Sequence, residues 1–233
     1  MKKFLKYTVI AVCVIIFCVV AVYTFKGYSM YRSALKENPP EQTIAKIQSS
    51  ENYVSLDVLP HMYVNSVIAV EDRRFYYHNG VDPVSIFRAV LTDIRQMKLV
   101  EGGSTITQQF AKNTFFTQER KLERKIAEMF MAFRLERMYD KKEILELYVN
   151  TIYFGSGYYS IREASLGYYG KEPWELNDYE CTMLAGLPNA PSVYSLDNNP
   201  DLARQRQNQV ITKLIKYKYI TEEERERILE NAP

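Results

Sequence analysis

The 233-residue sequence predicts a mainly α-helical domain preceded by one N-terminal transmembrane helix. Apolar residues recur at helical spacing and N-terminal capping signals recur along the chain, whereas the alternating patterns of strands are weak. An uncharged apolar run near the N-terminus predicts the membrane span. Apolar residues make up 47% of the chain, enough for a sizeable core, and a formal charge of +2 gives no reason to expect a nucleic-acid partner. Three cysteines, two of them inside the apolar run, exclude a disulfide scaffold.

The run between Lys6 and Lys26 consists of nineteen uncharged residues, YTVIAVCVIIFCVVAVYTF. As a helix it would be roughly 30 Å long, which matches the hydrocarbon core of a bilayer. A cleaved signal peptide is the alternative, but no small-x-small cleavage site follows the run. The lysines of residues 1–6 favour a cytoplasmic N-terminus. We therefore expect a single-pass protein with residues 7–25 in the membrane and everything after them outside.

Residues 26–50 are polar and contain Pro39-Pro40, which predicts a stalk before a domain at 51–233. The first helix of the domain should run from Pro60 to about Asp72. The next should begin at Asp82-Pro83, with an apolar face of Val84, Phe87, Val90, Leu91, Ile94 and Met97, and end at Gly102-Gly103. Later helices are indicated by the stripe Leu122, Ile126, Met129 and Phe133, by Val210 with Leu214, and by capping-box pairs. These pairs are Thr105/Gln108, Asp140/Glu143, Ser160/Glu163 and Thr221/Glu224.

Glu71 interrupts the apolar face of the helix expected from Pro60 to Asp72. This face consists of Val64, Val67 and Ile68, and Glu71 is the next position on it. A carboxyl group on a buried face, near the carbonyl end of a helix, should have a raised pKa. A general base needs a pKa close to neutrality, so Glu71 is a candidate for that role. The structural alternative is that Glu71 pairs with Arg73 or Arg74 at the helix end.

A second carboxylate, Glu128, follows Arg124 by four residues and Arg120 by eight. The three side chains share roughly one face of a helix, and the two cations should lower the pKa of the carboxyl group. One carboxyl group with a raised pKa and one with a lowered pKa would suit a divided acid/base site. The alternative is a solvated i,i+4 ion pair worth about a few tenths of a kcal/mol.

The segment GGSTITQQFAKN, residues 102–113, predicts a helix N-terminus that could hold an anion. Ser104 or Thr105 would cap the helix, and the backbone N–H groups of its first turn suit an anion. A lysine, two amides and this N-terminus could together form a cradle for a diphosphate. The side chains concerned are Gln108, Gln109 and Lys112. Glycine followed by a capping residue also begins many ordinary helices, so this pattern alone is not specific.

Tyrosine is abundant, with 19 residues, and aromatic side chains gather in residues 143–161. Amphipathic rings favour buried positions and the membrane interface. We therefore expect core or interface packing here rather than a ligand site. The residues concerned are Tyr148, Tyr153, Phe154, Tyr158 and Tyr159.

Taken together, these segments resemble the glycosyltransferase domain that polymerises peptidoglycan, the family shared by bifunctional penicillin-binding proteins and monofunctional transglycosylases. Its four central motifs correspond in order to EDRRFYYHNGVD (71–82), GGSTITQQFAKN (102–113), RKIAE (124–128) and ILELYVNTIYFG (144–155). Its closing motif corresponds to MLAGLPNAPSVYSL (183–196). The resemblance covers roughly residues 53–220. It implies a lysozyme-like α fold with a smaller, membrane-facing lobe.

The resemblance also implies roles for individual residues. Glu71 would be the base that activates the 4-hydroxyl of the acceptor sugar, and Glu128 the second glutamate, which supports the leaving diphosphate. Lys112 and Arg120 would lie near the donor diphosphate, and Arg124 and Lys125 would form the basic pair of the third motif. The other implied substrate-binding residues are Asp72, Phe75, His78, Ser104, Thr105, Gln108, Gln109 and Asn113.

The expected reaction joins a lipid-diphosphate-linked glycan to lipid II through a β-1,4 linkage and releases the polyprenyl diphosphate. Expected partners are lipid II, the growing glycan strand, the bilayer, and transpeptidases or other wall-synthesis proteins. A divalent metal (Mg or Mn) is allowed but not required, with Glu128 as its candidate ligand. The location expected is the bacterial cell (inner) membrane. The end of the chain at Pro233 favours the monofunctional type, although a piece of a bifunctional protein would have the same features.

Two alternatives to polymerisation are considered. A lysozyme-like hydrolase or lytic transglycosylase would share the fold but cut glycan. Lys112, Arg120 and Arg124 disfavour it, because a cleaving enzyme has no diphosphate leaving group to stabilise. A non-catalytic scaffold for wall-synthesis proteins is the second alternative, and the presence of both Glu71 and Glu128 disfavours it.

Overall fold

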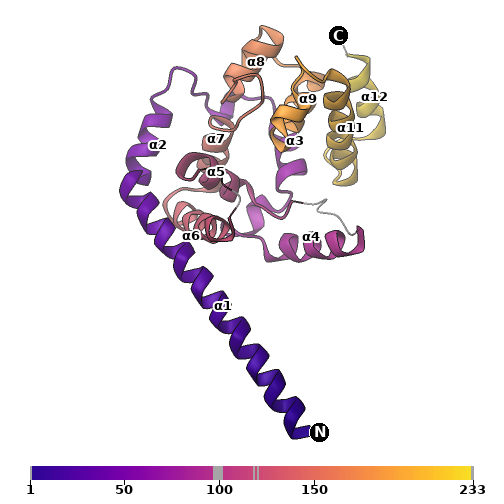
Figure 1. Cartoon of the computed structure of the whole chain (residues 1–233). Coiled ribbons are helices and arrows are strands. Elements are labelled where there is room, and N and C mark those ends of the chain that lie inside the picture. The colour runs from indigo at the N-terminus through magenta and orange to yellow at the C-terminus, as the bar shows by residue number, and fades with distance from the viewer. Residues whose placement is uncertain (1, 97–101, 118, 120, 232–233) are drawn as a thin grey trace.

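The computed structural model describes residues 2–96, 102–117, 119 and 121–231. Figure 1 shows that helices joined by short loops make up this part of the chain. The described residues contain two isolated β-bridges, Asn79–Val81 and Gly155–Tyr158, and no β-strand. The prediction of a mainly α-helical domain preceded by one apolar N-terminal helix is confirmed.

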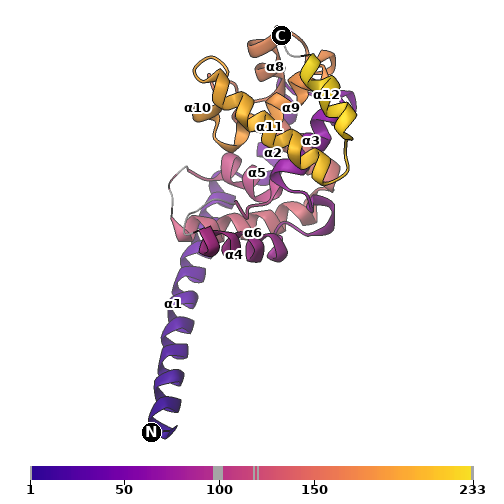
Figure 2. The same cartoon turned by 90° about the vertical axis from the view of Figure 1, so that its right-hand side faces the viewer.

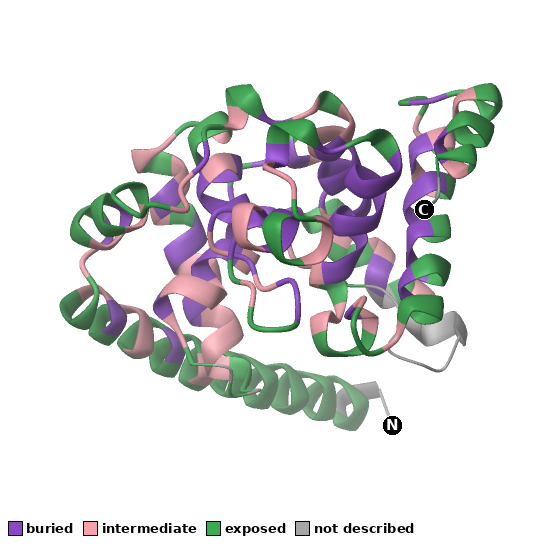
Figure 3. Cartoon of the chain, turned by 90° about the horizontal axis from the view of Figure 1, so that it is seen from above, coloured by how far each residue is buried: buried purple, intermediate pink, exposed green. Residues whose placement is uncertain are grey.

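The N-terminal helix α1 (Lys2–Glu37) is longer than the predicted span. Among the described helices it is the one with the length and apolar composition needed to cross a membrane. Its residues 4–22 are all exposed, as the green colour of this helix in Figure 3 shows, and Figure 1 shows this part of the helix extending away from the domain. A helix that is apolar on all sides and has no protein partner matches a membrane span.

Residues 26–50 differ from the predicted stalk, because most of them are helical and pack on the domain. Residues 26–37 continue α1 and contact α6 (Leu122–Met138), and α2 (Pro40–Gln48) buries Ile44. The contact with α6 is close at Gly27, where a Cβ atom would lie 2.6 Å from Ile126 Cγ2. The Phe130 ring is 5.4 Å from that of Tyr28 and 5.8 Å from that of Tyr31. The segment is polar on average, yet its apolar residues share one helix face, which the composition alone did not reveal.

Two groups of helices form the core of the domain (Figures 1 and 2). The first group is α3 (His61–Glu71), α9 (Asp178–Gly186) and α11 (Pro200–Lys216). The second is α5 (Ile106–Phe115), α6 and α7 (Lys141–Val149). The remaining helices are η1 (Leu56–Val58), η2 (Phe75–Tyr77), α4 (Pro83–Gln96), α8 (Ile161–Tyr169), η3 (Pro173–Glu175), η4 (Leu187–Asn189), α10 (Pro191–Tyr194) and α12 (Glu222–Glu230).

Capping explains where several of these helices begin. The predicted capping boxes at Thr105, Asp140 and Thr221 are confirmed, each with both reciprocal hydrogen bonds. Ser160 forms half a box, because it accepts from the Glu163 backbone while the Glu163 carboxylate bonds elsewhere. A further box, Asn177 with Glu180, was not predicted. The start of α5 at Thr105 matters most, since it fixes the side chains that α5 presents to the site.

The stripe predicted on α6 is not its buried face. Leu122 and Phe133 are 57% and 41% exposed. The buried residues of this helix are Ala127, Glu128, Met131, Ala132 and Leu135. Because α6 packs against both α1 and α5, its apolar residues lie on two sides of the helix and do not form a single stripe. The same geometry turns Glu128 inward.

The expected apolar face of α4 is exposed where it is described. Val84, Phe87 and Leu91 are 51%, 66% and 37% exposed, while Met97 and the side chains of Val90 and Ile94 lie outside what the structure describes. Figures 1 and 2 both show α4 along the edge of the domain from which the free half of α1 extends. An exposed apolar helix beside a membrane span is suited to contact with lipid.

The aromatic side chains of residues 143–161 differ in burial. Tyr148 and Phe154 are fully buried, as expected for core packing. Tyr159 is 60% exposed and stacks on Tyr153, with ring centroids 4.6 Å apart. The segment leads into α8, which Figures 1 and 2 show at the end of the domain opposite the free half of α1. Tyr159 is therefore not part of the core, and its contact with a membrane interface stays a prediction.

A pair of truncations tests the α1–α6 contact. Deleting residues 1–25 should leave the domain folded, because the contact with α6 begins at Lys26, whose Nζ lies 3.9 Å from Glu123 Oε1. Deleting residues 1–37 should expose the Phe130 side of α6 and lower the melting temperature in detergent by roughly 6–12 °C, the effect of about 3 kcal/mol in a chain of this size. Thermal unfolding followed by circular dichroism measures both. Equal melting temperatures for the two truncations would contradict the contact.

Candidate active site

A cleft of about 610 Å³ lies between the α3–α9–α11 group and a wall formed by α4, α5 and the loop before α5. In the described part of the chain its lining includes six basic and two acidic side chains. The basic residues are Arg73, Arg88, Lys112, Arg206, Lys213 and Lys216, and the acidic residues are Glu71 and Asp72. The chain as a whole carries only +2, so its positive charge is concentrated here. Such a cleft suits an anionic ligand.

Glu71 is the last residue of α3, and its side chain lies in this cleft, 7% exposed. Its Oε2 accepts a hydrogen bond from Gln109 Nε2 at 2.7 Å. Its Oε1 lies 3.8 Å from Arg206 Nη2, and no hydrogen bond reaches it from the described residues. One oxygen is therefore held by the protein, while the other keeps lone pairs that can accept a proton. The predicted burial of this carboxylate is confirmed.

The helix-end partners considered for Glu71 are engaged elsewhere. The Arg73 guanidinium lies over the Tyr217 ring, 5.1 Å from its centroid. Arg74 Nε lies 3.0 Å from Asp82 Oδ2. The alternative of a helix-end ion pair is therefore wrong. The cation that faces Glu71 is instead Arg206, which belongs to α11.

The contribution of α11 was missed by the sequence analysis. Arg206 is 7% exposed and donates from Nε to Gly186 O at 3.3 Å and from Nη1 to Gln209 Oε1 at 2.9 Å. Lys213 Nζ donates to Val70 O at 3.1 Å, which ties α11 to the end of α3. A polar face at helical spacing was the available signal. It is formed by Arg206, Gln209, Lys213 and Lys216.

Helix α5 presents Gln109 and Lys112 to the cleft, about one turn apart. Gln109 donates to Glu71 and accepts a long hydrogen bond, 3.4 Å, from the buried Tyr148 hydroxyl. Burial lowers the pKa of Lys112, and repulsion from Arg124 lowers it further, while attraction to Glu71 acts in the opposite direction. Lys112 therefore interacts electrostatically with Glu71 and also with Arg124, the partner of Glu128.

Glu128 is buried, with its side chain 1% exposed, and it forms ion pairs with two cations of its own helix. Arg124 Nη1 bonds Glu128 Oε1, and Lys125 Nζ lies 3.0 Å from Oε2. Lys125 also donates to Ser104 Oγ at 2.7 Å, and Ser104 lines the cleft. The alternative of a solvated surface ion pair is therefore wrong. Arg120 lies outside the described residues.

Lys125 is a cation whose charge is easily lost. Burial lowers its pKa to about 8, with further lowering from the nearby charges of Arg124 and Lys112. A bound anion would favour the charged form of Lys125 and should raise this pKa.

Asp72 lies beneath Glu71 in a buried network. Its Oδ2 accepts from the backbone N–H of Ile106 at 3.1 Å and lies 2.8 Å from His78 Nε2. Thr105 Oγ1 donates to Gly80 O at 2.6 Å. These contacts fix the start of α5 against the segment that follows α3. Asp72 and His78 are therefore placed to position α5, and only Asp72 of the two lines the cleft.

The diphosphate cradle predicted at the start of α5 needs correction. The first-turn N–H groups of Ile106 and Gln108 are bonded by Asp72 and by the Thr105 side chain. The Gln108 side chain is buried and returns to the Thr105 backbone. The helix N-terminus and Gln108 are therefore occupied by the protein itself. Gln109 and Lys112 are the side chains of this segment that reach the cleft.

Two other residues implied by the resemblance lie away from the cleft lining. Phe75 is fully buried, with Lys141 Nζ 4.5 Å from its ring centroid. Asn113 is half-buried on α5 and is not among the described residues that line the cleft. Their geometry suits packing more than contact with a ligand.

The surroundings of Glu128 fit a divalent metal poorly. Both carboxylate oxygens contact cationic side chains, Arg124 and Lys125. Within the described residues, no group of three His, Cys, Asp or Glu side chains converges to hold an ion. Mg²⁺ and Mn²⁺ prefer several oxygen ligands. We therefore assign no step to a metal.

The known proteins that are similar to this chain are transglycosylases and penicillin-binding proteins. The family model described as "Transglycosylase" matches residues 40–215. Penicillin-binding protein 1A of Aquifex aeolicus is 49% identical over 181 residues, which cover 78% of this chain and 25% of that protein. A protein of Cupriavidus necator, provisionally named a transglycosylase, is 37% identical over 78% of this chain and 79% of its own length.

Other penicillin-binding proteins are similar over the same region. Penicillin-binding protein 1F of Bacillus subtilis is 44% identical over 73% of this chain and 24% of that protein. The chain thus spans about a quarter of the length of these penicillin-binding proteins.

Substitution of Asp72 distinguishes a positioning role from substrate contact. Asp72→Ala leaves two buried donors, on His78 and Ile106, without their acceptor. At about 1–3 kcal/mol for each donor, the melting temperature should fall by roughly 4–24 °C. The matched control Asp57→Ala, at an exposed ion pair with Lys142, should change it little. An unchanged melting temperature with weakened substrate binding would instead support the contact that the resemblance implies.

Proposed function

The chain belongs to the transglycosylase family, and we propose that it polymerises peptidoglycan by transferring a lipid-diphosphate-linked glycan onto lipid II. The observation that carries this proposal is a proton-accepting oxygen, Glu71 Oε1, beside a cleft rich in cations. A glycan-cleaving enzyme would need a carboxyl group but has no diphosphate leaving group for these cations to stabilise. The cationic cleft therefore favours synthesis over cleavage.

Glu71 is the proposed general base. Its Oε1 would take the proton of the acceptor 4-hydroxyl as that oxygen attacks C1 of the donor sugar. The hydrogen bond from Gln109 to Oε2 holds the carboxylate in place, and Arg206 Nη2 lies 3.8 Å from Oε1. Attack from the face opposite the diphosphate inverts the anomeric centre and gives the β-1,4 linkage.

The cations are proposed to stabilise the leaving group. As the bond from C1 to the phosphate oxygen breaks, its electron pair goes to the polyprenyl diphosphate. Lys112 and Lys125 can offset that charge, and Lys125 reaches the cleft through Ser104. Glu128 would hold Arg124 and Lys125 in position.

The membrane geometry supports a lipid-linked substrate. The exposed apolar face of α4 and the free half of α1 lie at the same edge of the domain. Lipid II carries its polyprenyl tail in the bilayer, so its head group could enter the cleft beside α4. We propose that the domain lies outside the cell membrane, with the lysines of residues 1–6 in the cytoplasm. Transpeptidases and other wall-synthesis proteins would then be neighbours of its product.

Glu71→Gln tests the proposed base. The change keeps the hydrogen-bonding shape but removes the proton acceptor, so polymerisation of lipid II should fall by about 10²–10⁴-fold. The control Glu226→Gln, on the exposed face of α12, should keep normal turnover. Near-normal turnover of Glu71→Gln, with its folding confirmed by circular dichroism, would refute the assignment.

Lys112→Ala tests stabilisation of the leaving group. If Lys112 acts on charge that develops in the transition state, kcat should fall by roughly 10²–10³-fold, with a smaller change in KM. Lys142→Ala removes an exposed lysine and should alter neither constant. A rise in KM at constant kcat would assign Lys112 to binding alone.

The pKa of Lys125 predicts a pH-dependent proton uptake. The free side chain loses its proton near pH 8, and a bound diphosphate should restore it. On binding inorganic diphosphate at about pH 8 to 9, the unmodified chain should therefore take up more protons than Lys125→Gln, while at about pH 6 the two should differ little, because the proton exchange of the ligand itself is common to both. Calorimetry in two buffers of different ionisation enthalpy measures this uptake. Lys125→Gln should reduce it, and an uptake unchanged in that variant would contradict the prediction.

A further inference from the structure

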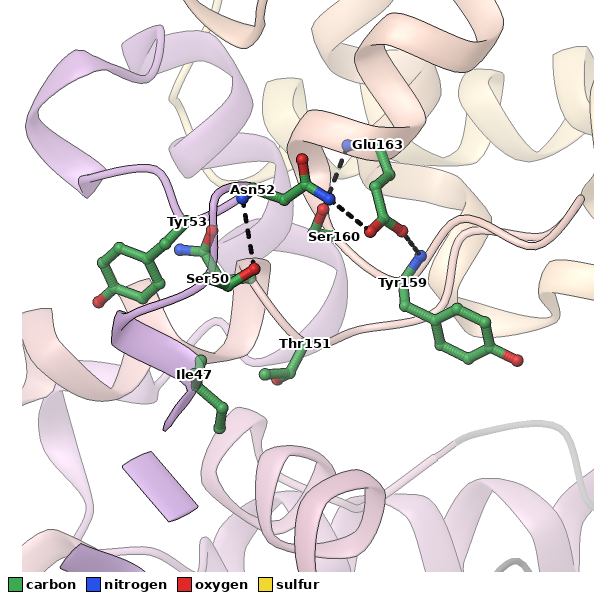
Figure 4. Close-up of a pocket in the computed structure, with 9 residues that line it drawn as sticks. Ile47, Ser50, Asn52, Tyr53, Thr151, Tyr159, Ser160 and Glu163 are labelled. Carbon is green, nitrogen blue, oxygen red and sulfur yellow. Dashed lines mark hydrogen bonds between the residues drawn. The ribbon is translucent and has the colours of Figure 1, made fainter. Parts of the chain in front are cut away.

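A second cavity, of about 260 Å³, lies outside the catalytic cleft and shares none of its lining residues. Figure 4 shows that it is formed by the segment after α2, the end of α7 and the start of α8. Among its described lining residues there is no lysine or arginine, in contrast to the cleft. The two cavities therefore suit different ligands.

The walls of this cavity are held together by hydrogen bonds between distant segments. Asn150 bonds the backbone of Val54 in both directions, with Val54 N donating to Oδ1 and Nδ2 donating to Val54 O, each at 2.8 Å. Asn52 Nδ2 donates to Glu163 Oε1 at 2.8 Å, which joins the loop to α8 (Figure 4). A cavity with fixed walls can bind without first ordering its own side chains.

The polar groups facing the cavity are mostly uncharged. Thr151 Oγ1 donates to Leu147 O, and Ser160 Oγ accepts from Glu163 N. Thr151 Oγ1 therefore keeps lone pairs that can accept from a ligand, and Ser160 Oγ keeps a proton that it can donate to one. The Glu163 carboxylate already accepts from Asn52 and from the Tyr159 backbone at 2.7 Å. The cavity thus offers hydroxyl and amide groups that match a neutral polyhydroxyl ligand.

An aromatic surface adjoins the cavity. Tyr159 stands at the rim in Figure 4, with its ring directed away from the interior. This ring is 60% exposed and stacks on Tyr153 at an interplanar angle of 29°. Positive φ angles at Gly155, Ser156 and Gly157 form the tight loop that brings the two tyrosines together. Ring faces carry partial negative charge and attract the C–H groups on the face of a sugar ring.

We propose that this cavity and the Tyr153–Tyr159 pair form a non-catalytic binding site for uncharged sugar units of a glycan strand. The cavity is smaller than the roughly 300–1,000 Å³ of sites that enclose drug-sized ligands, so it would take one sugar ring. The next unit along the strand would lie on the exposed tyrosine face. The absence of basic residues in the described lining disfavours phosphate-bearing ligands. This inference rests on the proposed function, because the strand is the product of that reaction.

The test uses the full chain in detergent and a fluorescently labelled oligosaccharide of β-1,4-linked N-acetylglucosamine. This probe has no lipid, diphosphate or peptide, and its binding is followed by fluorescence anisotropy. Tyr159→Ala should raise the Kd at least about tenfold. The control Tyr77→Ala, at a tyrosine that is 80% exposed elsewhere, should leave the Kd unchanged. Because Tyr159 is exposed, thermal unfolding of the variant should match that of the unmodified chain.

Three outcomes would overturn the proposal. They are no binding to the unmodified chain, an unchanged Kd for Tyr159→Ala, and displacement of the probe by a free stem peptide but not by unlabelled oligosaccharide. Lys112→Ala and Glu71→Gln should retain probe binding, since both residues lie in the other cavity. Loss of binding in these two variants alone would assign the sugar to the cleft and refute the second site. Failure of lipid II turnover with probe binding intact would refute the proposed function alone.

Discussion

The arrangement of the site depends on one buried carboxylate held between two helices. Glu71 ends α3, accepts a hydrogen bond from Gln109 of α5 and faces Arg206 of α11. An ionised carboxylate with so little exposure is costly unless polar or cationic groups compensate it. The two groups of core helices must therefore approach one another where α3 ends. The cleft and its cations follow from that approach, since α5 also carries Lys112, and α11 also carries Lys213 and Lys216.

A second buried carboxylate fixes the other side of the site by the same principle. Glu128 forms ion pairs with both Arg124 and Lys125, and burial, followed by repulsion from Arg124 and Lys112, lowers the pKa of Lys125. Asp72 acts between these two regions, because it bonds the start of α5 and His78 at once. Glu71 and Asp72 thus join the end of α3 to α5, α11 and His78, while Glu128 holds two cations of its own helix. A diphosphate would supply the negative charge that the cationic cleft lacks.

Local features were predicted well from the sequence, and long-range partners were not. The Thr105 capping box depends on residues three positions apart, and it was predicted and found. The Arg206–Glu71 contact joins residues 135 positions apart, and nothing in the periodicity of α11 indicates which carboxylate it faces. Gln108 was predicted both as the capping partner of Thr105 and as part of the diphosphate cradle, and its side chain serves the cap. On α6, contacts with both α1 and α5 hid the buried face that contains Glu128.

The central claim is that the cationic cleft binds a diphosphate-linked donor and catalyses synthesis of glycan. The most direct measurement incubates the full chain with labelled lipid II and follows both polymer and polyprenyl diphosphate over time. The account predicts a muramidase-sensitive polymer, with one polyprenyl diphosphate released for each unit added to the strand. Shortening of preformed strands without diphosphate release, or no polymer at all, would contradict it.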